Sequence, residues 1–284
     1  MPALVSVIMP CYNDGKYIQK AIESLERQTY SNYELIVIDD GSDDVETQKI
    51  IYGLKKRNNI LILHTNHLRP AGARNYGIEH AKGKYILPLD SDDMIEPTYI
   101  EKAVEILERR PLVGVVYCQA DLFGEAKGKW NLPDYSREQL LLDNIVFVTA
   151  MFYRKDWELV GGFKTNMDAG MEDYDFWLSI LELGREIYQI PEILFHYRIK
   201  SVSRTTIFQD NSLQVQKIYR RIFENHKEFY KENYDIVIPV LRDALIEQIF
   251  LRKRLEKQLE YVKRIKTIPV LGWILKRLLK NKEI

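Results

Sequence analysis

Apolar residues in the first hundred positions occur as short continuous runs that alternate with stretches of helical periodicity. The runs are three to five residues long and rich in Val, Ile and Leu, which is typical of buried strands. The predicted strands are 5–9, 34–38, 60–64 and 85–89, and the helices that follow the first three are 17–28, 45–56 and 71–80. This alternation predicts an α/β fold with a mainly parallel sheet covered by helices on both faces.

The alternation becomes less regular after residue 93. A helix is expected at 97–109 and a strand at 113–118, and the next candidate elements are strands 147–153 and 195–199 and helix 174–183. From residue 209 the pattern is mostly helical, with Pro239 and Pro269 expected to interrupt it. We therefore predict a mixed extension of the sheet, followed by a helical C-terminal region.

The charges balance overall but not locally. The chain has 41 Lys and Arg against 41 Asp and Glu, so no global field attracts nucleic acid, and we expect no nucleic-acid partner. Residues 252–284, however, hold eleven Lys or Arg and three Glu. This asymmetry predicts an acidic body with a basic C-terminal appendage.

Two observations bear on the cellular compartment. The chain has two cysteines, Cys11 and Cys118, each in a strand-like context, which does not indicate a disulfide framework. The first residues do not resemble a signal peptide, and no apolar run reaches the roughly 18 residues of a membrane span. We expect a cytoplasmic protein.

Three carboxylates crowd the end of the strand at 85–89, in the run Asp90-Ser91-Asp92-Asp93. Neighbouring carboxylates repel one another, and a magnesium or manganese ion relieves this repulsion by binding one or two acids together with substrate phosphates. The run therefore indicates a metal and a phosphate. The alternative is a solvated acidic turn or a cap for the next helix.

Polar residues also follow the first two strands, at 10–13 and 39–43. Because ligands bind at the carboxyl ends of parallel strands, these segments should converge with the acidic run. A tyrosine there can stack on a base, and an aspartate can accept hydrogen bonds from uracil or ribose. The chain lacks G-x-x-x-x-G-K-[ST], and its first strand is not followed by G-x-G-x-x-G, which favours a nucleotide site without a glycine-rich loop.

Four segments in this order carry a family resemblance: VSVIMPCYN at 5–13, ELIVIDDGS at 34–42, AGARNYG at 71–77 and YILPLDSDD at 85–93. They resemble inverting family 2 glycosyltransferases of the GT-A fold, over residues 4–205. The resemblance implies a catalytic domain at 1–205, divided into a nucleotide-sugar half at 1–115 and an acceptor half at 116–205. Residues 206–284 would form a helical extension.

The resemblance also implies a donor site. Tyr12 would line the base, Asp40 would bind uracil or ribose, and Arg74 would approach the nucleotide. The full nucleotide-binding set that we predict is Pro10, Tyr12, Asn13, Asp40, Ser42, Arg74, Ser91 and Asp92. The alternative for Arg74 is a surface charge on a helix. Asp39 is expected to cap its turn.

The resemblance implies that a D-x-D element, here Asp90-Ser91-Asp92, binds Mn²⁺ or Mg²⁺. Asp92 is the first candidate ligand, assisted by Asp90 or Asp93. His196 is a further candidate, because some family members place a histidine on the cation at this distance from the base. The alternative for His196 is a hydrogen-bonded strand histidine.

The run at 171–177 resembles the family's E-D motif, in which the aspartate is the general base, so Asp173 takes that role here. Without the resemblance, the same acids would indicate the first turn of a helix. Glu172 and Trp177 are expected to contact the acceptor, with core packing as the alternative for Trp177.

The implied function is metal-dependent, inverting transfer of a sugar from a nucleotide-diphosphate sugar, expected to be UDP-linked, to a carbohydrate or lipid-linked acceptor in polysaccharide or glycolipid assembly. A nucleotidyltransferase and a non-catalytic nucleotide-sugar binding module are the competing interpretations. Residues 268–284 form a basic amphipathic pattern that predicts either peripheral membrane contact or docking on the body or on a second subunit, as in a homodimer.

Overall fold

The computed structural model describes the chain except for residues 1, 56, 58, 168, 202–210 and 267–284. The chain divides into two compact units, Met1–Glu232 and Asn233–Ile284. The first unit is α/β and contains every strand that is described. The predicted amphipathic segment 268–284 lies outside the described residues.

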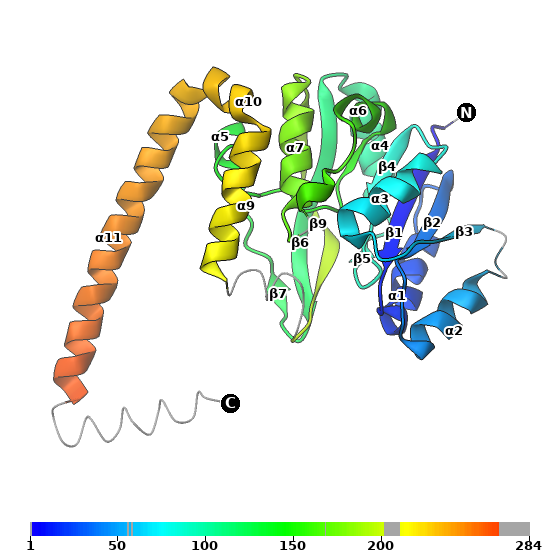
Figure 1. Cartoon of the computed structure of the whole chain (residues 1–284), viewed down its shortest axis with the longest axis horizontal. Coiled ribbons are helices and arrows are strands. Elements are labelled where there is room, and N and C mark those ends of the chain that lie inside the picture. Colours follow the sequence, from blue (N-terminus) through cyan, green and yellow to red (C-terminus); the bar gives the residue numbers. More distant parts are fainter. Residues whose placement is uncertain (1, 56, 58, 168, 202–210, 267–284) are drawn as a thin grey trace. The chain divides into compact units, whose positions relative to one another are not determined.

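A nine-stranded sheet forms the centre of the first unit (Figure 1). Its order is β3-β2-β1-β4-β8-β6-β9-β5, and β7 pairs with β6. The strands are β1 (Val5–Cys11), β2 (Tyr33–Asp39), β3 (Ile60–His64), β4 (Tyr85–Pro88), β5 (Met94–Ile95), β6 (Val113–Gly124), β7 (Gly128–Lys129), β8 (Met151–Tyr153) and β9 (Glu186–Ile199). Strands β3, β2, β1 and β4 are parallel, β8 is antiparallel to both of its neighbours, and β6 is parallel to β9. The predicted mainly parallel α/β fold is confirmed.

The helices of the first unit agree with the periodicity of the sequence in most cases. They are α1 (Gly15–Glu26), α2 (Val45–Leu54), α3 (Arg69–Glu79), α4 (Tyr99–Arg109), α5 (Arg137–Leu140), α6 (Arg154–Val160), η1 (Thr165–Met167), α7 (Glu172–Glu182), α9 (Ser212–Asn225) and α10 (Lys227–Glu232). In α1 the apolar side chains at 18, 21, 22 and 25 are buried, as their three- and four-residue spacing predicts. Burial of this stripe, rather than helix propensity alone, stabilises such a short helix.

Close packing of α3 on the sheet depends on Gly77. A Cβ atom at this position would lie 2.6 Å from the side chain of Ile38 and 2.9 Å from that of Ile8. The missing side chain lets the helix approach β1 and β2 closely. This approach brings the preceding turn of α3, with Arg74, against the carboxyl ends of the strands.

The last two helices of the first unit belong to the α/β body. In α9, Asn225 donates to Asp175 at 2.5 Å, and His226 follows this helix and contacts Asp175 at 3.2 Å and Glu182 at 2.7 Å. Both acids lie on α7, so α9 packs on α7, beside which it lies in Figure 1. These buried polar contacts join residues 211–232 to the body, so the first compact unit extends to Glu232. The catalytic domain at 1–205 stays a prediction.

The second unit consists, where it is described, of the helix α11 (Tyr234–Lys266). Pro239 lies inside this helix near its beginning and does not end it, contrary to the interruption expected from the sequence. No described helix of the protein has the length and apolar character needed to cross a bilayer.

Candidate functional site

Hydrogen bonds from Asn13 join the ends of β1 and β2. Asn13 has a left-handed backbone (φ 56°), and its side-chain oxygen accepts from the backbone N–H groups of Asp43 and Asp44, each at 3.0 Å. Its own N–H donates to the Ser42 hydroxyl at 3.1 Å. Asp39 accepts from the Ser42 N–H at 3.0 Å, which is the turn-capping role expected for it. Asn13 and Ser42 thus fix the two strand ends to each other.

Asp40 is buried and organises the segment between β3 and α3. Its two oxygens accept from the Thr65 hydroxyl at 2.6 Å, from the Leu68 N–H at 2.7 Å and from the Arg69 N–H at 2.8 Å. His67 and Arg69 have left-handed backbones (φ 57° and 64°), a strained conformation for non-glycine residues that these bonds stabilise. A carboxylate offers about four lone-pair sites, and the described residues fill three of those on Asp40.

Two aromatic side chains lie beside this turn. The rings of Tyr12 and His67 have centroids 4.4 Å apart with planes at 52°, and both residues are exposed. Tyr12 was predicted to line a base, and an exposed ring of this kind is suited to stacking. His67 was not identified from the sequence, because it lies in a loop without periodicity and only its spatial neighbour Tyr12 reveals it.

Arg74 is the centre of the site. The guanidinium is buried, its Nη2 donates to Asp90 Oδ1 at 2.7 Å, and its Nη1 donates to Glu172 Oε1 at 2.8 Å. Burial alone would lower the pKa of Arg74, but the two carboxylates raise it overall, so the side chain stays charged. The alternative of a surface charge on a helix is therefore excluded, and one side chain joins the D-x-D run to the E-D run.

The acidic run after β4 is partly buried. The pKa of Asp92 is raised by burial and by Asp90, although Lys200 opposes this. Burial, with Asp92 and Asp90 close by, holds the pKa of Asp93 well above its usual range. Asp93 accepts from the Arg198 N–H at 2.8 Å, and the Arg198 Nε donates to the Asp92 carbonyl at 2.7 Å. Strand β9 is thereby attached to the acidic turn.

Two members of this cluster were missed from the sequence. The Lys200 ammonium lies 2.8 Å from Asp92 Oδ2 and 3.1 Å from both carboxylate oxygens of Asp14. Asp14 directly follows the polar segment predicted at the end of β1, so extending that segment by one residue would have found it. Lys200 carries no comparable signal, because only the fold brings the end of β9 to β4. Ser91, between the two acids, is buried.

The cluster can be tested for its fit to a divalent cation. Carboxylate oxygens at strand ends are the right donors for Mg²⁺ or Mn²⁺, which also need phosphate and water oxygens. Among the described residues, no three His, Cys, Asp or Glu side chains are grouped so as to hold a metal. The carboxylates of Asp92 and of Asp90 or Asp93 are donors of the kind that fits a cation shared with a phosphate ligand.

His196 is placed differently from the prediction. Its Nδ1 lies 2.6 Å from Asp121 Oδ1 and its Nε2 lies 2.8 Å from Glu96 Oε1. Each ring nitrogen therefore contacts a carboxylate, one from β6 and one that follows β5. In this structure His196 is the hydrogen-bonded strand histidine of the alternative interpretation.

The three acidic residues at the start of α7 contact different partners. Asp173 is half-buried, and its Oδ1 accepts from the Asn144 side chain at 3.1 Å and from the Tyr174 N–H at 2.8 Å. Glu172 is buried against Arg74, and the Asp175 side chain is buried against α9. Glu172 thus holds the turn, and Asp173 is the acid of the three with some exposure.

Trp177 lies in the core. The residue is fully buried, and its indole N–H donates to the Val146 carbonyl at 2.9 Å. The expected contact with an acceptor is therefore not available in this structure, and core packing accounts for the side chain. The Glu172 side chain is also buried, at 2% exposure, and pairs with Arg74, so its contact with an acceptor stays a prediction.

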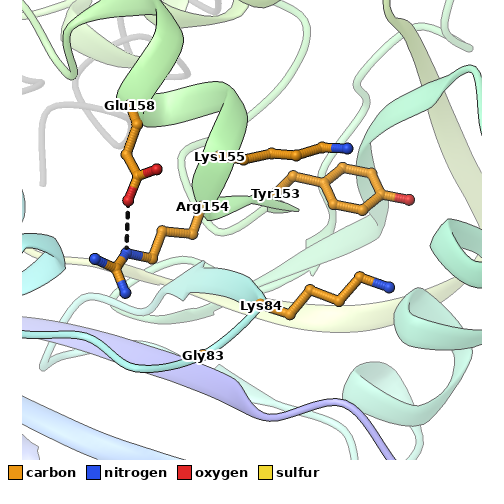
Figure 2. Close-up of a pocket in the computed structure, with 6 residues that line it drawn as sticks. All are labelled: Gly83, Lys84, Tyr153, Arg154, Lys155 and Glu158. Carbon is orange, nitrogen blue, oxygen red and sulfur yellow. Dashed lines mark ion pairs between the residues drawn. The ribbon is translucent and has the colours of Figure 1, made fainter.

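A cavity of 270 Å³ lies elsewhere, at the start of β4 (Figure 2). Its lining residues are Gly83, Lys84, Tyr153, Arg154, Lys155 and Glu158. Because the acidic cluster follows the other end of β4, this cavity does not belong to the site described above. Pro10, the remaining predicted residue, lies within β1, which continues one residue past it.

Comparisons with known proteins agree with this geometry. The family model described as Glycosyl transferase family 2 matches residues 6–164. A chondroitin synthase of Pasteurella multocida is 32% identical over 188 residues, which are 64% of this chain and 19% of that protein. This chain therefore matches about a fifth of that relative's length. An uncharacterised glycosyltransferase of Rickettsia typhi is 32% identical over 219 residues, 71% of this chain and 66% of that protein.

Solved structures show the same fold. Staphylococcus aureus TarS in complex with UDP-GlcNAc has a TM-score of 0.60 at 19% identity, covering 81% of this chain and 74% of that chain. A mannosyltransferase from Pyrobaculum calidifontis in complex with GDP-Man and Mn²⁺ has a TM-score of 0.59 at 20% identity, covering 90% and 80%. Together with the family match over more than half of its residues, these similarities show that the chain belongs to glycosyl transferase family 2 and has the GT-A fold.

Proposed function

We propose that the protein transfers a sugar from a nucleotide-diphosphate sugar, UDP-linked, to an acceptor hydroxyl with inversion at the anomeric carbon. One observation carries the proposal: the Arg74 guanidinium contacts both Asp90 and Glu172. The D-x-D run and the residue beside Asp173 are therefore within the span of one side chain. This proximity supports a single site in which the acidic run faces the donor phosphates and Asp173 faces the acceptor.

In this proposal the nucleotide lies over the ends of β1 and β2. Tyr12 and His67 stack on the base, and the remaining lone pair of Asp40 accepts from the uracil or the ribose. Asn13 and Ser42 act indirectly, because their hydrogen bonds hold the pocket wall in place. The UDP-containing complex of TarS, a protein with the same fold, supports a uridine nucleotide as the donor carrier.

Asp92, with Asp90 or Asp93, would hold a divalent cation together with the donor phosphates. When bound, such an ion neutralises the charge that develops on the leaving diphosphate. The Mn²⁺ in the mannosyltransferase complex supports manganese as the first ion to test.

Asp173 acts as the general base. It takes the proton of the acceptor hydroxyl while that oxygen forms its bond to the anomeric carbon. The bond between this carbon and the phosphate oxygen breaks, and the electron pair leaves on the nucleoside diphosphate. Asn144 holds one carboxylate oxygen of Asp173 and so fixes the orientation of the base. A single displacement of this kind inverts the configuration.

A nucleotide screen tests the donor part of the proposal. In the presence of Mn²⁺, UDP should raise the melting temperature, because a ligand that binds only the native state stabilises it. GDP and dTDP should raise it less, and Asp40→Ala should remove the difference. Equal shifts with all three nucleotides would contradict uridine selection, and NMR of the product's anomeric proton would test inversion directly.

A further inference from the structure

Lys200 is paired with Asp92, the first candidate ligand for a cation. It directly follows β9, and its ammonium lies 2.8 Å from Asp92 Oδ2. A second carboxylate, that of Asp14, lies 3.1 Å away. Both partners are partly buried, with side-chain exposures of 24% for Lys200 and 15% for Asp92.

The backbone holds Lys200 in this place. Two residues earlier, Arg198 donates its N–H to Asp93 and its Nε to the Asp92 carbonyl. The end of β9 is therefore attached to the same turn that carries the predicted ligand. The position of Lys200 next to Asp92 therefore follows from the backbone of β9.

A lysine ammonium and a divalent cation compete for the same carboxylate. Both are attracted to Asp92 Oδ2, and an ion placed at that oxygen would meet the positive charge of Lys200 at close range. A nucleoside diphosphate changes this balance, because it supplies new anionic oxygens for the ammonium and further ligands for the ion.

We propose that Lys200 is a built-in competitor for the divalent cation, which weakens metal binding until a nucleotide diphosphate draws the ammonium away from Asp92. The proposal rests on the proposed function, since it takes the ion and the diphosphate from there. It makes cation and donor binding mutually dependent: each strengthens the other by the same factor.

Direct titration of Mn²⁺ into the nucleotide-free protein, followed by EPR of the free ion, tests the proposal without measuring activity. Lys200→Met should bind Mn²⁺ about tenfold more tightly than the unmodified chain, which corresponds to ~1.4 kcal/mol. Lys200→Arg keeps the charge and should give no increase. Lys102→Met is the matched control, because Lys102 is paired with Glu192 away from the cluster and its loss should leave Mn²⁺ affinity unchanged.

Lys200→Gln provides a second neutral variant if Lys200→Met does not fold. Equal or weaker Mn²⁺ binding by the neutral variants would overturn the proposal. Absence of Mn²⁺ binding by every form, with and without UDP, would overturn it as well. In that case, UDP stabilisation measured in EDTA separates the two failures: if it persists, the nucleotide site stands and the metal part alone is lost.

Discussion

Removing the charge of Arg74 should destabilise the protein strongly. The residue is 1% exposed and forms two ion pairs, with Asp90 at 2.7 Å and Glu172 at 2.8 Å. In Arg74→Met the apolar volume is largely kept, but Glu172, whose side chain is 2% exposed, loses the positive charge of Arg74 with which it is paired. Breaking a buried pair on one side costs about 3–5 kcal/mol. Because the Asp90 side chain is 32% exposed and can be solvated, we expect about 3 kcal/mol.

Urea denaturation followed by circular dichroism measures this loss as a change in midpoint at constant slope. Arg57→Met is the matched control, because Arg57 and Glu26 form a 2.8 Å pair whose side chains are 36% and 45% exposed. An exposed pair of this kind contributes about 0–1 kcal/mol. Adding Glu172→Gln to Arg74→Met should restore part of the stability. If Arg74→Met loses no more than Arg57→Met, the assignment of Arg74 as the buried link between the two acidic runs is wrong.

Three further predictions concern packing, titration and catalysis. In thermal melts, Gly15→Ala should destabilise the protein by about 1–3 kcal/mol, because the added Cβ would lie 2.5 Å from the backbone of Thr47. Gly53→Ala should instead stabilise the protein by about 0.5–1 kcal/mol, because the space around Gly53 is open. Burial tends to lower the pKa of His226, but hydrogen bonds to two carboxylates raise this pKa overall. The protonated imidazole should therefore stabilise the fold fully below pH ~6.5, and this stabilisation should be lost as the pH rises through the raised pKa. His226→Gln should flatten this pH dependence of the melting temperature, and an unchanged profile would refute the assignment. For Asp173→Asn, turnover should fall by roughly 100- to 10,000-fold in a sugar-transfer assay.

The hydrophobic pattern predicted the first half of the sheet well. Strands at 5–9, 34–38, 60–64 and 85–89 lie within one residue of those observed at most ends, because short, fully buried strands of a parallel sheet have continuous apolar runs. The prediction was less accurate for β9, of which 195–199 is only the last part of Glu186–Ile199. Polar and exposed residues alternate irregularly in this strand, and its pairing with β6 contains register shifts, so no simple period marks it.

The sequence predicts which strand ends carry the site, but it does not predict which side chains contact one another there. Periodicity assigns a residue to an element, and the order of parallel strands brings the acidic segments to one edge. Neither shows that Arg74 would bridge to Glu172, 98 residues away, or that Lys200 would meet Asp92. Such pairs form only where packing of the elements brings two long side chains within hydrogen-bonding distance. For the same reason the sequence allows both acceptor contact and core packing for Trp177, and the full burial of the side chain favours core packing.

Donor binding and base catalysis should be separable in this protein, and one pair of measurements tests this. Sugar transfer and UDP affinity should be measured side by side for the unmodified chain and for Asp173→Asn, whose amide keeps the shape of the carboxylate but cannot take the proton. We predict unchanged UDP affinity together with the large fall in turnover. Near-normal transfer by Asp173→Asn, or a loss of UDP binding that parallels the loss of transfer, would contradict the central claim.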